Sequence, residues 1–192
     1  SVVNKEHKFE NETINKIDFN NKKVVLLTAH RRENWGEPMK GIFAAVREIV
    51  TKNEDVNVIF PMHKNPLIRE LAAEGFKGIE DKVHLIEPLE YVDFANLMAK
   101  CYLIMTDSGG IQEEAPALGK PVMVLRTETE RPEAIEAGTV KLAGINKDDI
   151  FNIANELIND KEAYEKMAHA ANPYGDGKAC ERIVNNIIEY FK

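Results

Sequence analysis

From Lys23 onward, short apolar runs alternate with longer segments in which apolar residues recur every three or four positions. Apolar runs of four or five residues between turns are typical of strands that are buried on both faces of a parallel sheet. We predict strands at 24–28, 56–60, 83–86, 102–106 and 122–125, and a brief one near 139–142. The helical period predicts helices at 38–52, 65–75, 91–100, 111–118, 133–137, 148–158, 161–170 and 177–191.

This alternation of strands and helices predicts an α/β fold, with a Rossmann-like parallel sheet, right-handed crossovers and helices on both faces. We expect one domain over residues 23–192, a length that can bury a single sizeable core. Residues 1–22 are polar and rich in Asn, Lys and Glu. Their composition predicts a linker or interdomain segment, as if the chain were cut from a longer protein.

Polar and cationic residues collect where the predicted strands end. The carboxyl ends of parallel strands meet at one edge of the sheet, and ligands of open α/β sheets bind there. The segments that follow the first five strands are 29–34, 61–65, 87–89, 107–110 and 126–133. The sequence therefore predicts a ligand site at this edge.

The turn after the fourth strand, Asp107-Ser108-Gly109-Gly110, leads directly into a helix. Glycines let a backbone approach an oxyanion closely, and the first N–H groups of a helix point toward such an anion. Ser108, Gly109 and Gly110 therefore suit a diphosphate. The alternative is a plain helix cap at Ser108 with a tight turn.

Two carboxylates follow in the same helix. Glu114 lies one turn in, and a carboxylate beside a phosphate is unfavourable unless it has another partner, such as the diol of a ribose. Glu113 is explained by the favourable interaction of an acidic residue with a helix N-terminus. These residues favour a nucleotide over a simple phosphate.

Two basic residues have both a functional and a structural interpretation. His30 directly follows the first strand beside Arg31 and Arg32, so it could carry a proton near a departing diphosphate, or it could be structural. Arg131 could clamp a phosphate or uracil, or it could form a surface ion pair with Glu128 or Glu133, which would contribute little to stability.

The composition excludes several other classes. The net charge is -7 and no dense Lys/Arg cluster occurs, so we expect no nucleic-acid partner. Cys101 and Cys180 are isolated, which predicts neither a disulfide framework nor a metal site and fits a reducing cytoplasm. No apolar stretch approaches the ~18 residues of a membrane span. P-loop and G-x-G-x-x-G motifs are absent, and we expect no cofactor.

The ordered motifs of the chain resemble those of the non-hydrolysing UDP-N-acetylglucosamine 2-epimerases. The resemblance runs from about Lys23 to the C-terminus and is carried by residues 28–34, 88–91, 107–114, 115–121, 129–133 and 172–177. It implies the C-terminal half of a two-domain GT-B-type enzyme that is commonly dimeric. The other partners that it implies are the missing N-terminal domain and UDP-N-acetylglucosamine or UDP.

The resemblance also implies roles for particular residues. Ser108, Gly109 and Gly110 would hold the diphosphate and Glu114 the ribose, while Phe94 and the backbone near Leu89 would contact the uracil side. On periodicity alone, Phe94 is predicted to be a core residue. His30 and Arg131 would line the substrate site, with His30 the catalytic candidate in this chain. Arg31, Glu33 and His63 match positions linked to a second, activating UDP-N-acetylglucosamine.

The implied reaction inverts C2 of the sugar by eliminating UDP and adding it back on the other face. The acid and base carboxylates of the family lie on the N-terminal domain, so we expect this chain alone to be inactive. Three alternatives stay open: a GT-B glycosyltransferase, a hydrolysing 2-epimerase and a stand-alone UDP-sugar sensor. The His30-Arg31-Arg32-Glu33 run argues against the first two, and the truncated look of residues 1–22 against the third.

Overall fold

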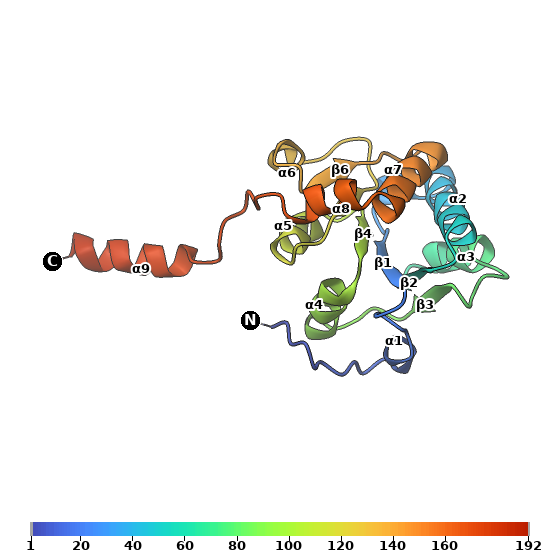
Figure 1. Cartoon of the computed structure of the whole chain (residues 1–192), viewed down its shortest axis with the longest axis horizontal. Coiled ribbons are helices and arrows are strands. Elements are labelled where there is room, and N and C mark those ends of the chain that lie inside the picture. Colours follow the sequence, from blue (N-terminus) through green and yellow to red (C-terminus); the bar gives the residue numbers. More distant parts are fainter. Residues whose placement is uncertain (1, 192) are drawn as a thin grey trace.

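A computed structural model describes residues 2–191 of the chain. Within this range the strands form one parallel sheet in the order β3-β2-β1-β4-β5-β6 (Figure 1). The chain builds the sheet outward from β1 to β3 and then returns to β4 on the other side of β1, so the strand order reverses between β1 and β4. This is the Rossmann order, and it confirms the predicted fold class. The strands are β1 (Lys23–Thr28), β2 (Val56–Pro61), β3 (Val83–Ile86), β4 (Leu103–Thr106), β5 (Val122–Val124) and β6 (Val140–Leu142).

Every predicted helix is present, with boundaries within two residues of the expected ones. The helices are α2 (Glu37–Lys52), α3 (Pro66–Gly75), α4 (Tyr91–Lys100), α5 (Gly109–Ala117), α6 (Pro132–Glu136), α7 (Lys147–Asn159), α8 (Lys161–Ala168) and α9 (Ala179–Tyr190). Two short elements were missed, α1 (Glu12–Asn15) and the 3-10 helix η1 (Arg32–Asn34). Each is a single turn, too short to show a periodic pattern.

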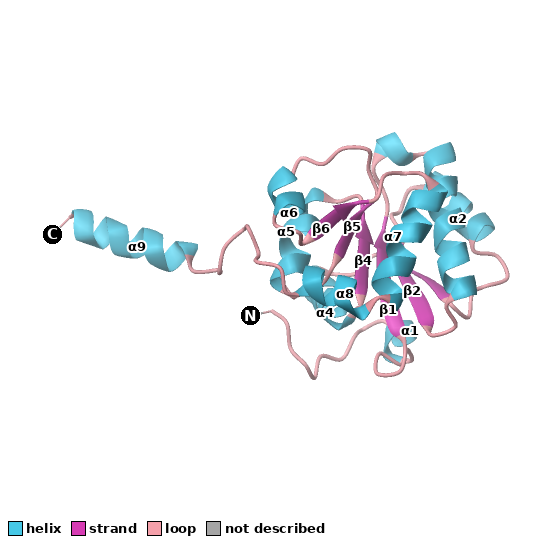
Figure 2. Cartoon of the chain, turned by 45° about the horizontal axis from the view of Figure 1, so that its top comes forward, coloured by secondary structure: helices cyan, strands magenta, loops and turns pink. Residues whose placement is uncertain are grey.

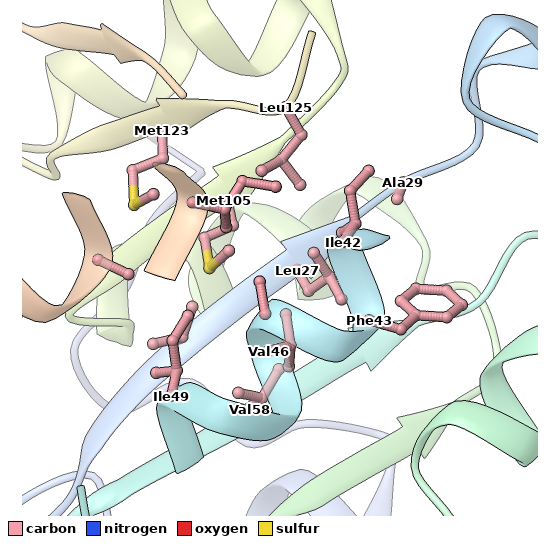
Figure 3. Close-up of a cluster of buried hydrophobic side chains, with 14 of the residues drawn as sticks. Leu27, Ala29, Ile42, Phe43, Val46, Ile49, Val58, Met105, Met123 and Leu125 are labelled. Carbon is pink, nitrogen blue, oxygen red and sulfur yellow. The ribbon is translucent and has the colours of Figure 1, made fainter. Parts of the chain in front are cut away.

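The alternation of side chains along each strand divides the core into two layers. Val25 and Leu27 face a layer formed with α2, α3 and α7, in which Phe43 is buried (Figure 3). Val24 and Leu26 face a second layer, which receives side chains from α1, α4 and α5. Because helices cover both faces of the sheet, the strands are apolar on both sides, as their sequences predicted.

The N-terminal segment packs against the second layer. Phe9 and Ile14 are buried there, with 4% and 0% of their surfaces exposed. The carboxylate of Asp93 on α4 accepts the backbone N–H of Glu10 at 3.1 Å and pairs with His7 at 2.6 Å. The polar composition of residues 1–22 concealed these two core residues, and the interdomain role of the segment stays a prediction.

Helix α9 follows an extended segment and stands away from the rest of the chain (Figure 2). None of its residues is buried. Ile183, Val184, Ile187 and Ile188 recur at helical spacing, and each is more than half exposed. The described part of the chain therefore leaves an apolar helix face without a partner. No helix in residues 2–191 is long and apolar enough to cross a membrane.

Candidate nucleotide site at the carboxyl edge of the sheet

Hydrogen bonds fix the turns after β1 and β4 to each other. The hydroxyls of Thr28 and Thr106 meet at 2.6 Å in the buried ends of the two strands. The backbone N–H of Asp107 donates to the carbonyl of Thr28 at 3.1 Å, and the N–H of Ser108 donates to the hydroxyl of Thr106 at 3.0 Å. The point at which the strand order reverses is therefore a defined structure before any ligand binds.

Asp107 holds the loop after β1 in place through hydrogen bonds to its carboxylate. It is fully buried, and its Oδ2 accepts the backbone N–H groups of His30 and Arg31 at 2.8 Å each and the Asn34 amide at 3.1 Å. The other oxygen, Oδ1, lies 3.1 Å from Nδ1 of His30. One carboxylate thus sets both the backbone of this loop and the orientation of its histidine.

The contact between His30 and Asp107 shifts the pKa values of both side chains. Hydrogen bonding to Asp107 raises the pKa of His30 above its ordinary value, against the opposing effects of burial and of Arg31. Burial pushes the pKa of Asp107 upward, but the hydrogen bonds from His30 and Arg31 outweigh it, and the pKa lies below its ordinary value. Both shifts favour an imidazolium beside a carboxylate.

A pocket of about 250 Å³ opens above these turns. It is lined by Thr28, Ala29, His30, Pro61, His63, Pro88, Leu89, Phe94, Ser108 and Ile111. Five predicted site residues, from the ends of four strands and from α4, therefore meet in one cavity. Pro88, Leu89, Phe94 and Ile111 make one part of the wall apolar, while the rings of His30 and His63 stack with centroids 6.0 Å apart. Phe94 is half-buried, so it is a wall residue as well as a core contact.

The turn that begins α5 borders open space. Ser108 occupies the N-cap position, but its side chain makes no capping hydrogen bond, so a capping role does not account for this serine. Gly109 and Gly110 do not have positive φ, so backbone strain does not explain them either. A Cβ on Gly110 would meet no atom of the described chain within 4 Å. The space above this glycine is open at the positive end of a helix, as an anion would require.

Glu114 lies one turn further along α5 and is exposed. Its Oε2 accepts a hydrogen bond of 3.2 Å from the hydroxyl of Tyr91, the first residue of α4. The negative charge of Glu114 raises the pKa of Tyr91 above its ordinary value. Tyr91 thus holds one of the two carboxylate oxygens of Glu114.

Arg131 contacts α5 from the loop after β5. The prediction that its ion-pair partner would be Glu128 or Glu133 is wrong. Arg131 pairs with Glu113 at 2.6 Å, and neither Glu128 nor Glu133 is its ion-pair partner. The loop is held against α5 because the Thr129 hydroxyl donates to the buried Gln112 side chain at 2.7 Å. Helix α5 therefore positions Arg131 through two neighbouring side chains.

The three residues predicted for a second ligand have different side-chain partners. Glu33 pairs with the buried Arg126 at 2.7 Å, and Arg126 also contacts Glu130 at 3.4 Å. Arg31 approaches the same Glu130 at 3.8 Å. His63 instead faces the pocket, stacked on His30. Arg126, which the sequence placed at the carboxyl edge without a particular role, therefore links the loops after β1 and β5.

Tyr174 lies after α8, in segment 172–177, which carries part of the family resemblance. Its side chain packs against the second core layer. Burial, with the nearby charge of Glu133, raises the pKa of the hydroxyl to about 12. Tyr174 therefore lies between the second core layer and the charged residues at the start of α6.

Asp107, Tyr91, Gln112, Thr129 and Arg126 were missed as site residues. Asp107 had a detectable signal, because an acidic residue at the very end of a buried strand must find donors. The others act through contacts between separate elements, for which a single sequence gives no signal.

A larger cavity, of about 810 Å³, lies at the β6 edge between α6 and α8. Its wall includes Ile135, Leu142, Ile153, Ala163 and Met167 and none of the predicted site residues. It shares no lining residue with the smaller pocket, and its size does not outweigh the chemistry of that pocket. Among residues 2–191, no group of three or more His, Cys, Asp or Glu side chains could hold a metal ion.

The strand order, the open glycine turn and the pocket at the point of reversal define a Rossmann-like nucleotide-binding domain. The family model described as UDP-N-acetylglucosamine 2-epimerase matches residues 2–188, and the chain belongs to this family. UDP-N-acetylglucosamine 2-epimerase of Bacillus subtilis is 57% identical over 169 residues, which cover 88% of this chain and 44% of the relative.

Two solved structures are similar in fold and sequence. The S. aureus MnaA–UDP co-structure matches with a TM-score of 0.89 and 51% identity over 99% of this chain and 51% of that one. UDP-GlcNAc 2-epimerase from Neisseria meningitidis, bound to UDP-GlcNAc, matches with a TM-score of 0.85 and 47% identity over 93% and 47% of the two chains. The present chain thus spans about half the length of these relatives.

Proposed function

We propose that the chain is the C-terminal, UDP-binding half of a non-hydrolysing UDP-N-acetylglucosamine 2-epimerase of the two-domain GT-B type. The observation that carries this proposal is the pocket at the β1–β4 reversal, where His30 and Ser108 meet beside an open helix N-terminus. The substrate is inferred from the names of the relatives. A second domain is inferred because the relatives are about twice as long as this chain.

Each part of UDP has a chemically suitable partner. The Ser108 hydroxyl and the N–H groups of Gly109 and Gly110 bind the diphosphate. The oxygen of Glu114 that Tyr91 leaves free accepts from the ribose. Leu89 and Phe94 contact the uracil through the apolar wall of the pocket. Arg131 adds positive charge once the ligand competes with Glu113 for its guanidinium.

The reaction requires a good leaving group. The C2 proton of the sugar is not next to a carbonyl, so direct removal is very unfavourable. In the proposed sequence C2 loses its proton as the C1–oxygen bond to the diphosphate breaks, which gives a glycal and UDP. UDP then adds back at C1 while C2 gains a proton on the opposite face. This chain stabilises the departing diphosphate, with His30 as its catalytic candidate.

The acid and base that act at C2 belong to the N-terminal domain in this proposal, so the chain alone does not epimerise. The apolar face of α9 supports such a partner, because Ile183, Val184, Ile187 and Ile188 have no packing partner within residues 2–191. We propose that this face packs on the N-terminal domain of the same protein. The whole enzyme is then a homodimer, as is common in the family.

Arg31, Glu33 and His63 extend the site toward a second UDP-N-acetylglucosamine that would act as an activator. Arg31 and Glu33 share the ion pairs around Glu130 and Arg126, so an added anionic ligand would redistribute these pairs. We place the enzyme in the cytoplasm, since Cys101 and Cys180 are both free thiols, as is usual in a reducing compartment.

Product analysis with the full-length protein tests the function. Incubation with UDP-N-acetylglucosamine should give UDP-N-acetylmannosamine, and NMR of the anomeric protons measures this conversion. Free N-acetylmannosamine with UDP would indicate the hydrolysing subtype instead, and a new glycosidic bond to an added acceptor would indicate a glycosyltransferase. The 192-residue chain assayed in parallel should show no turnover, and measurable epimerisation by it would contradict the assignment of the acid and base.

A further inference from the structure

Asp107 is a buried carboxylate with unequal oxygens. Oδ2 accepts three hydrogen bonds, from two backbone N–H groups and the Asn34 amide. Oδ1 is equally buried, and the donor that faces it within the described chain is Nδ1 of His30, at 3.1 Å. A buried carboxylate oxygen is costly without a donor, so the proton of this pair belongs on Nδ1.

The position of the Asp107 carboxylate determines which nitrogen of the His30 ring carries the proton. A carboxylate only accepts, so Nδ1 must carry hydrogen in both the neutral and the charged ring. Nε2 is the second nitrogen of the ring and is not the one paired with Asp107, and the ring lines the pocket with Ser108. A proton taken up from solvent then goes to Nε2, which becomes a cationic donor at the place where the diphosphate binds.

We propose that Asp107 is a positioning residue, whose Oδ1 keeps a proton on Nδ1 of His30 so that Nε2 is the atom offered to the diphosphate. This role rests on the proposed function, since the ligand of Nε2 is the diphosphate of UDP. The raised pKa of His30 agrees with it. The other charged or titratable groups around the ring are His63, stacked on it, and Arg31, which approaches Glu130.

The first test needs neither UDP nor a variant. Nitrogen-15 NMR of the His30 ring, recorded above its titration midpoint, reports which nitrogen carries the single proton. We expect the proton on Nδ1. A neutral ring protonated at Nε2 would overturn the proposal, whether or not the chain binds UDP.

The second test uses Asp107→Asn. The amide oxygen can still accept from the backbone N–H groups of residues 30 and 31, while the amide nitrogen donates toward His30. The His30 titration midpoint should fall, and UDP affinity near pH 6 should fall about ten- to a hundredfold, the range expected for one charge-assisted hydrogen bond. His30→Gln should lose as much UDP affinity as Asp107→Asn. The double variant should lose no more UDP affinity than either single variant.

Asp93→Asn is the matched control. Asp93 is also buried and also bonded to a histidine and a backbone N–H, yet it does not line the pocket, so UDP affinity should not change. Additive losses in the double variant, or an unchanged His30 titration in Asp107→Asn, would reduce Asp107 to a structural role. If Asp107→Asn does not fold, the tautomer of the wild-type chain decides the question. Failure of the wild-type chain to bind UDP would count against the proposed function alone.

Discussion

Gln112 and Thr129 meet in a 2.7 Å hydrogen bond that joins helix α5 to the loop after β5. Gln112 is completely buried, and its amide also donates to the carbonyl of Ser108 at 3.1 Å. The Thr129 hydroxyl in turn accepts the backbone N–H of Arg131 at 3.1 Å. This pair therefore sets the distance between the diphosphate turn and the cation predicted to act with it.

Thr129→Val should destabilise the fold because it leaves the buried Gln112 oxygen without its donor. Loss of one partner in a buried hydrogen bond costs about 1–3 kcal/mol, and urea denaturation measures this cost. Thr127→Val is the matched control, since Thr127 is exposed two residues earlier, and its change should stay within about 0.5 kcal/mol. Equal effects at the two positions would show that the loop is not held by this bond.

Ser108→Ala should separate binding from stability. Because the hydroxyl does not cap α5, the free energy of unfolding should change by less than about 0.5 kcal/mol, while UDP binds about tenfold more weakly. Asn146 provides the contrast, since its side chain accepts from Asp148 and Asp149 at the start of α7. Asn146→Ala should cost about 1 kcal/mol and leave UDP binding intact. A stability loss in Ser108→Ala like that of Asn146→Ala would restore the capping explanation.

Gly110→Ala should raise the free energy of unfolding and lower the affinity for UDP. The new methyl group meets no atom of the described chain within 4 Å, and alanine reduces the entropy of the unfolded chain, a gain of about 0.4–1 kcal/mol. The same methyl group occupies the space of the diphosphate, so calorimetry should show a fall in UDP affinity. Gly138→Ala, at φ 78°, should instead lose stability. Unchanged UDP affinity in Gly110→Ala would place the phosphate elsewhere.

The pair of Asp107 and His30 predicts how stability varies with pH. The pKa of His30 is raised above its ordinary 6.5, so its contribution is complete below pH 6.5 and is lost as pH rises through the folded pKa. The pKa of Asp107 is lowered from 3.8, so its contribution is present above pH 3.8 and is lost as pH falls through the folded pKa. The stabilising window therefore lies between these limits.

Unfolding free energies of the wild type and His30→Gln, measured across pH, test this window. The advantage of the wild type should be largest between pH 3.8 and 6.5 and should decline toward alkaline pH. An advantage that stays constant from about pH 5 to 9 would mean that the interaction does not depend on the charge of His30.

The sheet and most helices could be predicted because each is a regular run. The apolar strands at 24–28 and 102–106 are bounded by turns, and the helix at 38–52 has a clear period. The N-terminal segment was not predictable in this way. Phe9 and Ile14 are two apolar residues in a polar stretch, and their burial depends on contacts with α4 that lie about 80 residues away in the chain.

The site was predictable where it depends on strand order and less so where it depends on side-chain pairing. The carboxyl-edge rule brought His30, His63 and Ser108 together correctly. It could not select Glu113 over Glu128 as the partner of Arg131, because the loop must first fold back onto α5. Nor could it show that Glu33 pairs with Arg126 while His63 stacks on His30.

Titration of the isotope-labelled chain with UDP, followed by backbone NMR, tests the central claim most directly. UDP should bind and shift the amide signals of Ser108, Gly109 and Gly110 first, with those of His30 and Glu114 close behind. The β6-edge cavity lined by Leu142 and Met167 should stay unaffected. No binding at millimolar UDP, or shifts confined to that cavity, would contradict the assignment of the β1–β4 reversal as the nucleotide site.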